Sequence, residues 1–155
     1  MTLEYARRFA RHIDALGIEA EHLIFEQSCH TVEQAAQAVN GSADDLVKNL
    51  GMTDEYGELL VGIVKGPHRL STRRVAKACG LNAVVLADPT VILERTGYPV
   101  GGTPSFGFEA RFLIDPAVME QASVYTGGGS DRALVRISTK ELQRANNAQI
   151  VRIRK

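Results

Sequence analysis

This chain of 155 residues has only two cysteines, no long apolar run and a formal net charge of zero. The two cysteines, Cys29 and Cys79, lie far apart and form no CxxC pair, so they suggest neither a disulfide framework nor a structural metal site. No apolar run approaches the roughly 18 residues of a membrane span, and the opening residues lack the apolar centre of a secretory signal. These absences predict reduced thiols, no cofactor, no membrane contact and a cytoplasmic location.

The charges cancel, with 18 basic and 18 acidic side chains. Whole-molecule attraction therefore cannot supply the many phosphate contacts on which tight nonspecific binding to nucleic acid depends. Any nucleic acid must be held locally or delivered by a partner. The length and the 45% apolar content favour one core, so we expect residues 1–155 to form a single soluble domain.

Helix signals recur along the chain. Apolar residues three or four positions apart predict a helix over residues 3–16 that stops before Gly17. The patterns Thr31-x-x-Gln and Ser138-x-x-Glu resemble capping boxes and predict helices that begin just after them. Ser71 and Asp88-Pro89 predict two more helix starts, and Ser42 one or two further helical turns.

Strand signals lie between the helix signals. Short apolar runs predict strands at residues 23–25, 50–52, 59–64, 83–86, 112–114, 134–137 and 150–153. An acidic turn with a glycine, residues 54–57, favours a hairpin between two of them. Since no regular strand-helix repeat appears, the chain is predicted to be α+β, with a mixed, largely antiparallel sheet and surrounding helices.

Familiar catalytic signatures are missing from the sequence: there is no HExxH, GxSxG, Walker loop or correctly placed GxGxxG. The most unusual segment is the loop GYPVGGTPSFG at residues 97–107, in which glycines allow a ligand close to the backbone and prolines limit movement. Composition alone favours an ordered surface connection for this loop and a simple turn for the GGG at residues 127–129. Backbone groups are nevertheless the best candidates for chemistry here.

Three groups of side chains have both a functional and an ordinary interpretation. Lys48, in an apolar stretch, either extends its ammonium to solvent or meets an anion. Cys29 beside His30 could be a nucleophile and its base, although neighbouring side chains tend to point apart, which favours an inert thiol. The basic stretch with Arg69, Arg73 and Lys77 suits either an RNA backbone or plain solvent.

Taken together, several segments resemble the YbaK-like aminoacyl-tRNA deacylases, a family that includes the editing insertion of bacterial prolyl-tRNA synthetases. In order, these segments are TVEQAA (31–36), LVKNL (46–50), LLVGIVKG (59–66), GYPVGG (97–102) with FG (106–107), FLID (112–115) and TGG (126–128). No single segment is specific, but their order and spacing are.

The resemblance implies a partly barrel-like central sheet and a crevice between the lysine and the glycine loops. It implies that Lys48, Gly101 and Gly102 are catalytic, and that substrate is bound by Thr103, Asp115, Thr126, Gly127 and Gly128. Arg69, Arg73 and Lys77 would contact RNA. The partners it implies are the acceptor end of an aminoacyl-tRNA and a synthetase, and the substrate type is Cys- or Ala-tRNA(Pro).

Two departures from the family pattern stand out. Many relatives have proline where this chain has Ser105, whereas here proline comes one position earlier, at Pro104. Some branches have an acid in the strand after the glycine turn, where this chain reads Ala133-Leu134-Val135. Two alternatives to a deacylase also stay open: a binding module without catalysis, and a thiol hydrolase that uses Cys29.

Overall fold

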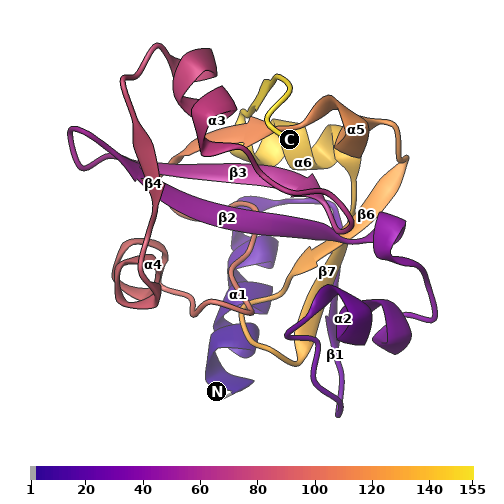
Figure 1. The fold of residues 1–155 in the computed structure, drawn as a ribbon. Helices are drawn as coiled ribbons and strands as arrows, with labels where there is room; N and C mark the ends of the chain where they lie inside the picture. Colours follow the sequence, from indigo (N-terminus) through magenta and orange to yellow (C-terminus); the bar gives the residue numbers. More distant parts are fainter. Residues whose placement is uncertain (1–2) are drawn as a thin grey trace.

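The computed structural model describes residues 3–155, and helices and strands alternate irregularly along them (Figure 1). The order is α1 (Leu3–Leu16), β1 (Ala20–Ile24), α2 (Val32–Ala38), the 3-10 turn η1 (Ala43–Asp45), β2 (Val47–Asp54), β3 (Leu59–Lys65), α3 (Thr72–Cys79), β4 (Val84–Leu86), α4 (Pro89–Thr96), β5 (Arg111–Ile114), α5 (Pro116–Met119), β6 (Ser123–Gly127), β7 (Ala133–Ser138), α6 (Thr139–Asn146) and β8 (Gln149–Ile150). Within residues 3–155, no helix is long and apolar enough to cross a membrane.

α2, α3 and α6 begin where the sequence predicts, because the expected caps are present. α4 also begins as predicted, at Pro89, although Asp88 makes no side-chain cap hydrogen bond. Thr31 and Gln34 form a complete capping box at the start of α2. The hydroxyls of Ser71 and Ser138 accept the third backbone N–H of α3 and α6. The turns predicted after Ser42 amount to a single 3-10 turn.

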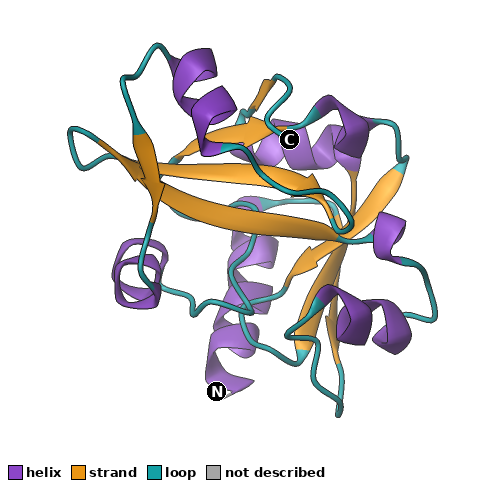
Figure 2. Ribbon diagram, in the orientation of Figure 1, coloured by secondary structure: helices purple, strands orange, loops and turns teal. Residues whose placement is uncertain are grey.

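The strands form two sheets, which confirms the α+β class and the mixed pairing (Figure 2). The five-stranded sheet has the order β4-β2-β3-β5-β8, antiparallel from β4 to β3 and parallel from β3 to β8. The three-stranded sheet, β1-β7-β6, is antiparallel throughout.

The expected barrel-like closure was wrong. Closure would require β2 and β6 to pair along their length, but within residues 3–155 their backbones share only an isolated bridge between Leu46, just before β2, and Tyr125. β2 pairs with β4 only over residues 52–54, so its preceding segment has a strand neighbour on the β3 side alone. This unpaired edge leaves room for a cavity.

β3 is buried on both faces and separates two cores. Val61 and Ile63 face a core shared with α1, α6 and the three-stranded sheet, whereas Leu60 and Val64 face α3. This follows from the period of two along a strand. Figure 2 shows α3 on one side of the long β2–β3 pair and α1 on the other.

Two elements were not predicted, and one prediction was too long. α5 is a single turn, and β6 contains only one aliphatic residue facing the core, Val124, so neither gives a strong periodic signal. The strand predicted at residues 150–153 ends at Ile150. Beyond it, the N–H of Ile153 donates to the Asp115 carboxylate and its carbonyl accepts from Ser71, in place of a strand ladder.

Candidate functional site

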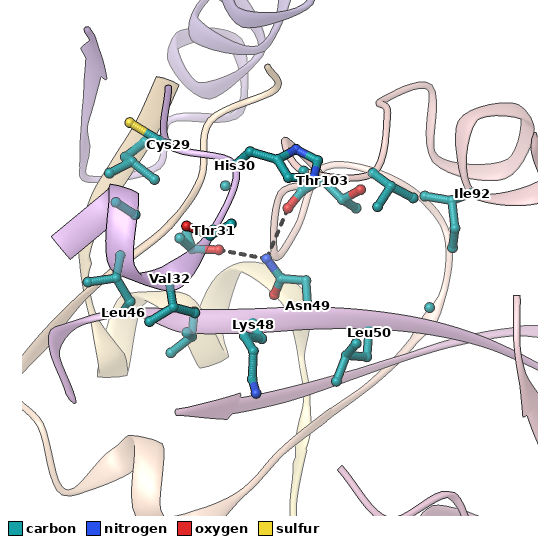
Figure 3. A pocket seen from close by; sticks show the side chains of 18 of the residues that line it. Cys29, His30, Thr31, Val32, Leu46, Lys48, Asn49, Leu50, Ile92 and Thr103 are labelled. Atoms are coloured by element: carbon teal, nitrogen blue, oxygen red, sulfur yellow. Dashed lines mark hydrogen bonds between the residues drawn. The ribbon is translucent and has the colours of Figure 1, made fainter. Parts of the chain in front are cut away.

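A cavity of about 310 Å³ lies beside the unpaired edge of β2 (Figure 3). Its volume is near the lower end for small-molecule sites, which suits a compact group. The lining comes from the start of α2, from β2, from the β4–α4 connection, from the glycine loop and from β6. The lining residues are Cys29, His30, Thr31, Val32, Ala35, Leu46, Val47, Lys48, Asn49, Leu50, Gly51, Leu86, Ala87, Ile92, Val100, Gly101, Thr103, Tyr125, Thr126, Gly127 and Leu134.

Polar side chains are joined at the wall of this cavity. The amide nitrogen of Asn49 donates to the Thr103 carbonyl at 2.9 Å and to the Thr126 hydroxyl at 2.8 Å (Figure 3 draws Asn49 and Thr103). The Ser105 hydroxyl donates to Oδ1 of Asn49 at 2.6 Å and lies 2.5 Å from the Thr126 hydroxyl. Ser105 and Thr126 are fully buried. The glycine loop is thus tied to β2 and β6 by side chains.

The two glycines predicted to be catalytic have different surroundings. Gly101 lines the cavity with a left-handed φ of 93°, and a Cβ there would lie 2.2 Å from Nδ1 of His30. Gly102 does not line the cavity. Its N–H donates to the Pro99 carbonyl, and a Cβ would lie 2.6 Å from the Ser130 backbone. Gly101 therefore faces the cavity, while Gly102 permits close packing behind it.

The predicted substrate-binding residues at positions 103 and 126–128 divide in the same way. Thr103, Thr126 and Gly127 line the cavity. A Cβ on Gly127 would lie 2.2 Å from the Thr103 carbonyl oxygen, so only glycine permits this approach of β6 to the loop. Gly128 is not a lining residue and packs against the backbone of Ala133.

Lys48 lines the same cavity as Gly101 and Gly127, but its side chain leaves β2 on the face opposite to Asn49 (Figure 3). This is the alternation expected of adjacent strand residues. Partial burial lowers the pKa of the Lys48 ammonium, and the nearby Arg69 lowers it further, while Glu33 opposes both. The ammonium thus stands among charged groups beside the cavity, away from the glycine loop.

Asp115 lies outside the cavity lining and has a full set of partners of its own. It is fully buried and accepts hydrogen bonds from the backbone N–H groups of Ala117, Ile153 and Arg154. The Arg154 guanidinium donates to Oδ2 at 2.7 Å. Burial alone would raise the pKa of this carboxyl, but together these hydrogen bonds hold it below its ordinary value. Its geometry is that of a structural clamp.

Arg69, Arg73 and Lys77 are exposed and lie outside the cavity lining. Arg73 and Lys77 occur one turn apart on α3, and Arg69 precedes that helix. The carbonyl of Arg69 accepts the N–H of Lys155, which brings the C-terminal lysine beside it. Of these residues, Arg69 is near enough to Lys48 to affect its pKa, and Arg73 and Lys77 are exposed on α3.

Cys29 lines the cavity but has the character of a core thiol. It is 5% exposed, and Figure 3 shows its sulfur directed away from Asn49 and Thr103. Burial raises the pKa of the thiol, and the Asp131 carboxylate raises it further. A neutral thiol is a poor nucleophile, so these features argue against a thiol hydrolase.

Asn49 and Ser105 were not identified from the sequence as site residues. A usable signal existed, because asparagine is disfavoured in strands and Asn49 follows Lys48 in a segment predicted to be extended. Ser105 gave no such signal, since its role depends on a partner 56 residues away.

Residues 26–145 match the model of the aminoacyl-tRNA editing domain. The uncharacterized protein YwhH of Bacillus subtilis is 28% identical over 120 residues, 76% of either chain. The proline–tRNA ligase of Syntrophotalea carbinolica is 28% identical over 102 residues, which span 66% of this chain and 18% of the ligase.

Solved structures resemble the whole chain. The crystal structure of a proposed trans-editing enzyme for prolyl-tRNA synthetase superposes with a TM-score of 0.91 at 27% identity, covering 100% of this chain and 99% of that one. The crystal structure of the hypothetical protein APE2540 gives a TM-score of 0.86 at 30% identity over 94% of this chain and 98% of the other. From the family match and these likenesses, the chain belongs to the aminoacyl-tRNA editing domain family.

Proposed function

We propose that this protein is a trans-editing deacylase that hydrolyses the ester of mischarged tRNA, with Cys- or Ala-tRNA(Pro) as the expected substrate type. The observation that carries the proposal is the cavity on the unpaired edge of β2, where Gly101, Gly127 and Lys48 occur together. Membership of the editing family and the likeness to a proposed trans-editing enzyme support it.

The proposed reaction needs no side-chain nucleophile, because an aminoacyl ester is already activated. Water adds to the ester carbonyl, the bond to the ribose oxygen breaks, and a proton passes to that oxygen, which releases the amino acid and intact tRNA. We assign the main chain at Gly101 to hold the ester carbonyl, and the 2′-hydroxyl of the terminal adenosine to assist. Donors placed where negative charge develops stabilise such a transition state.

We assign Lys48 to a phosphate near the tRNA end, because its side chain points away from the glycine loop and its ammonium is affected by the charge of Arg69. Arg69, Arg73 and Lys77 would extend this contact along the RNA backbone. Since the formal net charge of the chain is zero, intrinsic tRNA affinity is expected to be weak, and delivery by a synthetase would compensate for it.

The proposal is tested with a panel of tRNAs that carry labelled alanine, cysteine or proline, assayed for multiple-turnover loss of the amino acid. Gly101→Ala should reduce turnover, because the methyl group meets His30 and the left-handed φ is strained. Gly57→Ala is the matched control: Gly57 has a φ of 80° in the β2–β3 turn, and a Cβ there meets nothing within 4 Å. Absence of turnover on every charged tRNA would refute the proposal.

The second candidate is a binding module that recognises an aminoacylated end without hydrolysis. The same cavity would serve such a role equally. In that case, the protein would retain charged tRNA in a filter-binding assay and would slow the spontaneous loss of the amino acid. A deacylase would instead accelerate that loss.

A further inference from the structure

We infer that Ser105 and Thr126 are positioning residues: with Asn49 they form a closed ring of hydrogen bonds that fixes the Gly101–Thr103 segment against β2. The inference rests on the proposed function, since it assigns these side chains a part in the same reaction. None of the three was assigned this role from the sequence.

The direction of every hydrogen bond in the ring follows from the donors available. The only proton of the Ser105 hydroxyl goes to Oδ1 of Asn49. The contact between Ser105 and Thr126 must therefore use the Thr126 proton. The Thr126 oxygen in turn accepts from Nδ2 of Asn49, which closes the ring. Each side-chain group acts once as donor and once as acceptor within it.

The Thr103 carbonyl determines which way the Asn49 amide faces. One amide proton of Asn49 donates to this carbonyl at 2.9 Å. Were the amide turned over, Oδ1 would face that carbonyl oxygen, and two acceptors would oppose each other. The Ser105 hydroxyl donates to Oδ1 in this orientation, so it supports the amide that donates to Thr103.

The ring joins three parts of the chain through their side chains. Asn49 belongs to β2 and Thr126 to β6, and within residues 3–155 the backbones of these two segments share only the bridge between Leu46, just before β2, and Tyr125. Ser105 belongs to the glycine loop, and its carbonyl also accepts from the Asn146 amide at the end of α6. Burial of Ser105 and Thr126 strengthens their hydrogen bonds, because water competes less for them.

A satisfied, buried ring at a cavity wall supplies rigidity where a reacting group must be placed accurately. Loss of one hydroxyl would leave Asn49 free to rotate and would release the loop that carries Gly101. A displacement of about 1 Å can reduce the rate roughly a hundredfold while binding changes little. The ring is thus predicted to affect kcat more than KM.

The test compares Thr126→Val, which has similar shape but no hydroxyl, with Thr126→Ser, which keeps the hydroxyl. We expect Thr126→Val to lower kcat by roughly tenfold to a hundredfold with little change in KM, and Thr126→Ser to restore most of it. The matched control is Thr139→Val, which removes another buried threonine hydroxyl, one that donates to the Gln121 carbonyl remote from the cavity. It should keep kcat within about twofold of the parent protein. A normal kcat in Thr126→Val, or equal losses in both Thr126 variants, would overturn the inference.

A second measurement does not depend on turnover. Hydrogen–deuterium exchange of a peptide spanning residues 97–108 should become faster in Thr126→Val and in Ser105→Ala, but not in Thr139→Val. Unchanged exchange in both ring variants would contradict the inference, and Ser105→Ala replaces Thr126→Val if the latter fails to fold. If the parent protein deacylates no tRNA, the proposed function fails, while the exchange experiment still tests the ring.

Discussion

At the scale of single residues, the distinction that matters most is which way a side chain leaves β2. Asn49 faces the glycine loop, and Lys48 leaves β2 on the opposite face (Figure 3). A lysine placed this way can meet a phosphate of the RNA while the reacting ester lies elsewhere in the cavity. Lys48 and Asn49 therefore have different expected effects on catalysis.

Lys48→Ala is predicted to cost about 2 to 4 kcal/mol of transition-state stabilisation, roughly a hundredfold or more in kcat/KM on charged tRNA. The loss should be much smaller on an aminoacyl-adenosine, which lacks the neighbouring phosphate. Rates on the two substrates provide the measurement. Equal losses on both substrates would indicate that Lys48 contacts the ester carbonyl instead of a phosphate. Unchanged turnover would show that Lys48 has no part in the mechanism.

Cys29→Ser is predicted to retain full deacylation. The thiol is buried, its pKa is raised, and its sulfur points away from the polar wall of the cavity. Steady-state rates and the response to a thiol-alkylating reagent check this. A hundredfold loss in the serine variant would instead identify a thiol nucleophile.

At the scale of elements, α3 presents a basic face beside the cavity. Arg73 and Lys77 are exposed and four residues apart, so both can follow one stretch of RNA backbone. Exposed basic side chains act on nucleic acid mainly through phosphates, and this attraction weakens with salt.

Reversing both charges on α3, in Arg73→Glu with Lys77→Glu, should raise the KM for charged tRNA and leave kcat nearly unchanged. The slope of log(kcat/KM) against log[salt] should decrease in magnitude by about one for each phosphate that the variant no longer binds. Arg7→Glu with Arg11→Glu is the matched control, because these residues have the same spacing on an exposed face of α1. An equal effect in both pairs would indicate that only net charge matters.

At the scale of the whole molecule, Asp115 fastens the C-terminal segment to the five-stranded sheet. Asp115 comes directly after β5, and its carboxylate accepts hydrogen bonds from Ile153 and Arg154. The C-terminal segment also pairs with the segment before α3, because the Ile153 carbonyl accepts the N–H of Ser71 and the N–H of Lys155 donates to the Arg69 carbonyl. Removing one partner of a buried ion pair leaves an uncompensated charge. The clamp is therefore expected to matter for stability.

Asp115→Asn is predicted to lower the free energy of unfolding by about 3 to 5 kcal/mol at neutral pH. Since the folded-state pKa lies below the ordinary value, the carboxylate stabilises the fold above about pH 4, and this contribution is lost as pH falls through the folded-state pKa. Urea denaturation of parent and variant should thus converge in acid. Glu4→Gln, in the exposed pair with Arg11, should change stability by less than about 1 kcal/mol.

Local signals in the sequence determined most of the elements. Caps, left-handed glycines and apolar periodicity act within a few residues, so the helices at residues 3–16, 32–38, 72–79 and 139–146 could be predicted. β6 and the early end of β8 could not, because they depend on long-range partners, β7 for β6 and Asp115 for the end of β8. α5 starts with a local signal, Asp115-Pro116, but is a single turn with no periodic pattern. The barrel-like sheet was wrong for a similar reason, since strand pairing is non-local.

The sequence by itself determined the family resemblance and the positions of Lys48, Gly101 and Gly127, which share one cavity. Only the tertiary structure separated Gly101 from Gly102, turned Lys48 away from the loop and placed Asp115 in a clamp. It also gave Ser105, noted in the sequence only as a departure from the family's proline, a partner in β2 and another in β6. The physical reason is that hydrogen bonds and close packing between distant segments depend on three-dimensional distance, which local patterns do not encode.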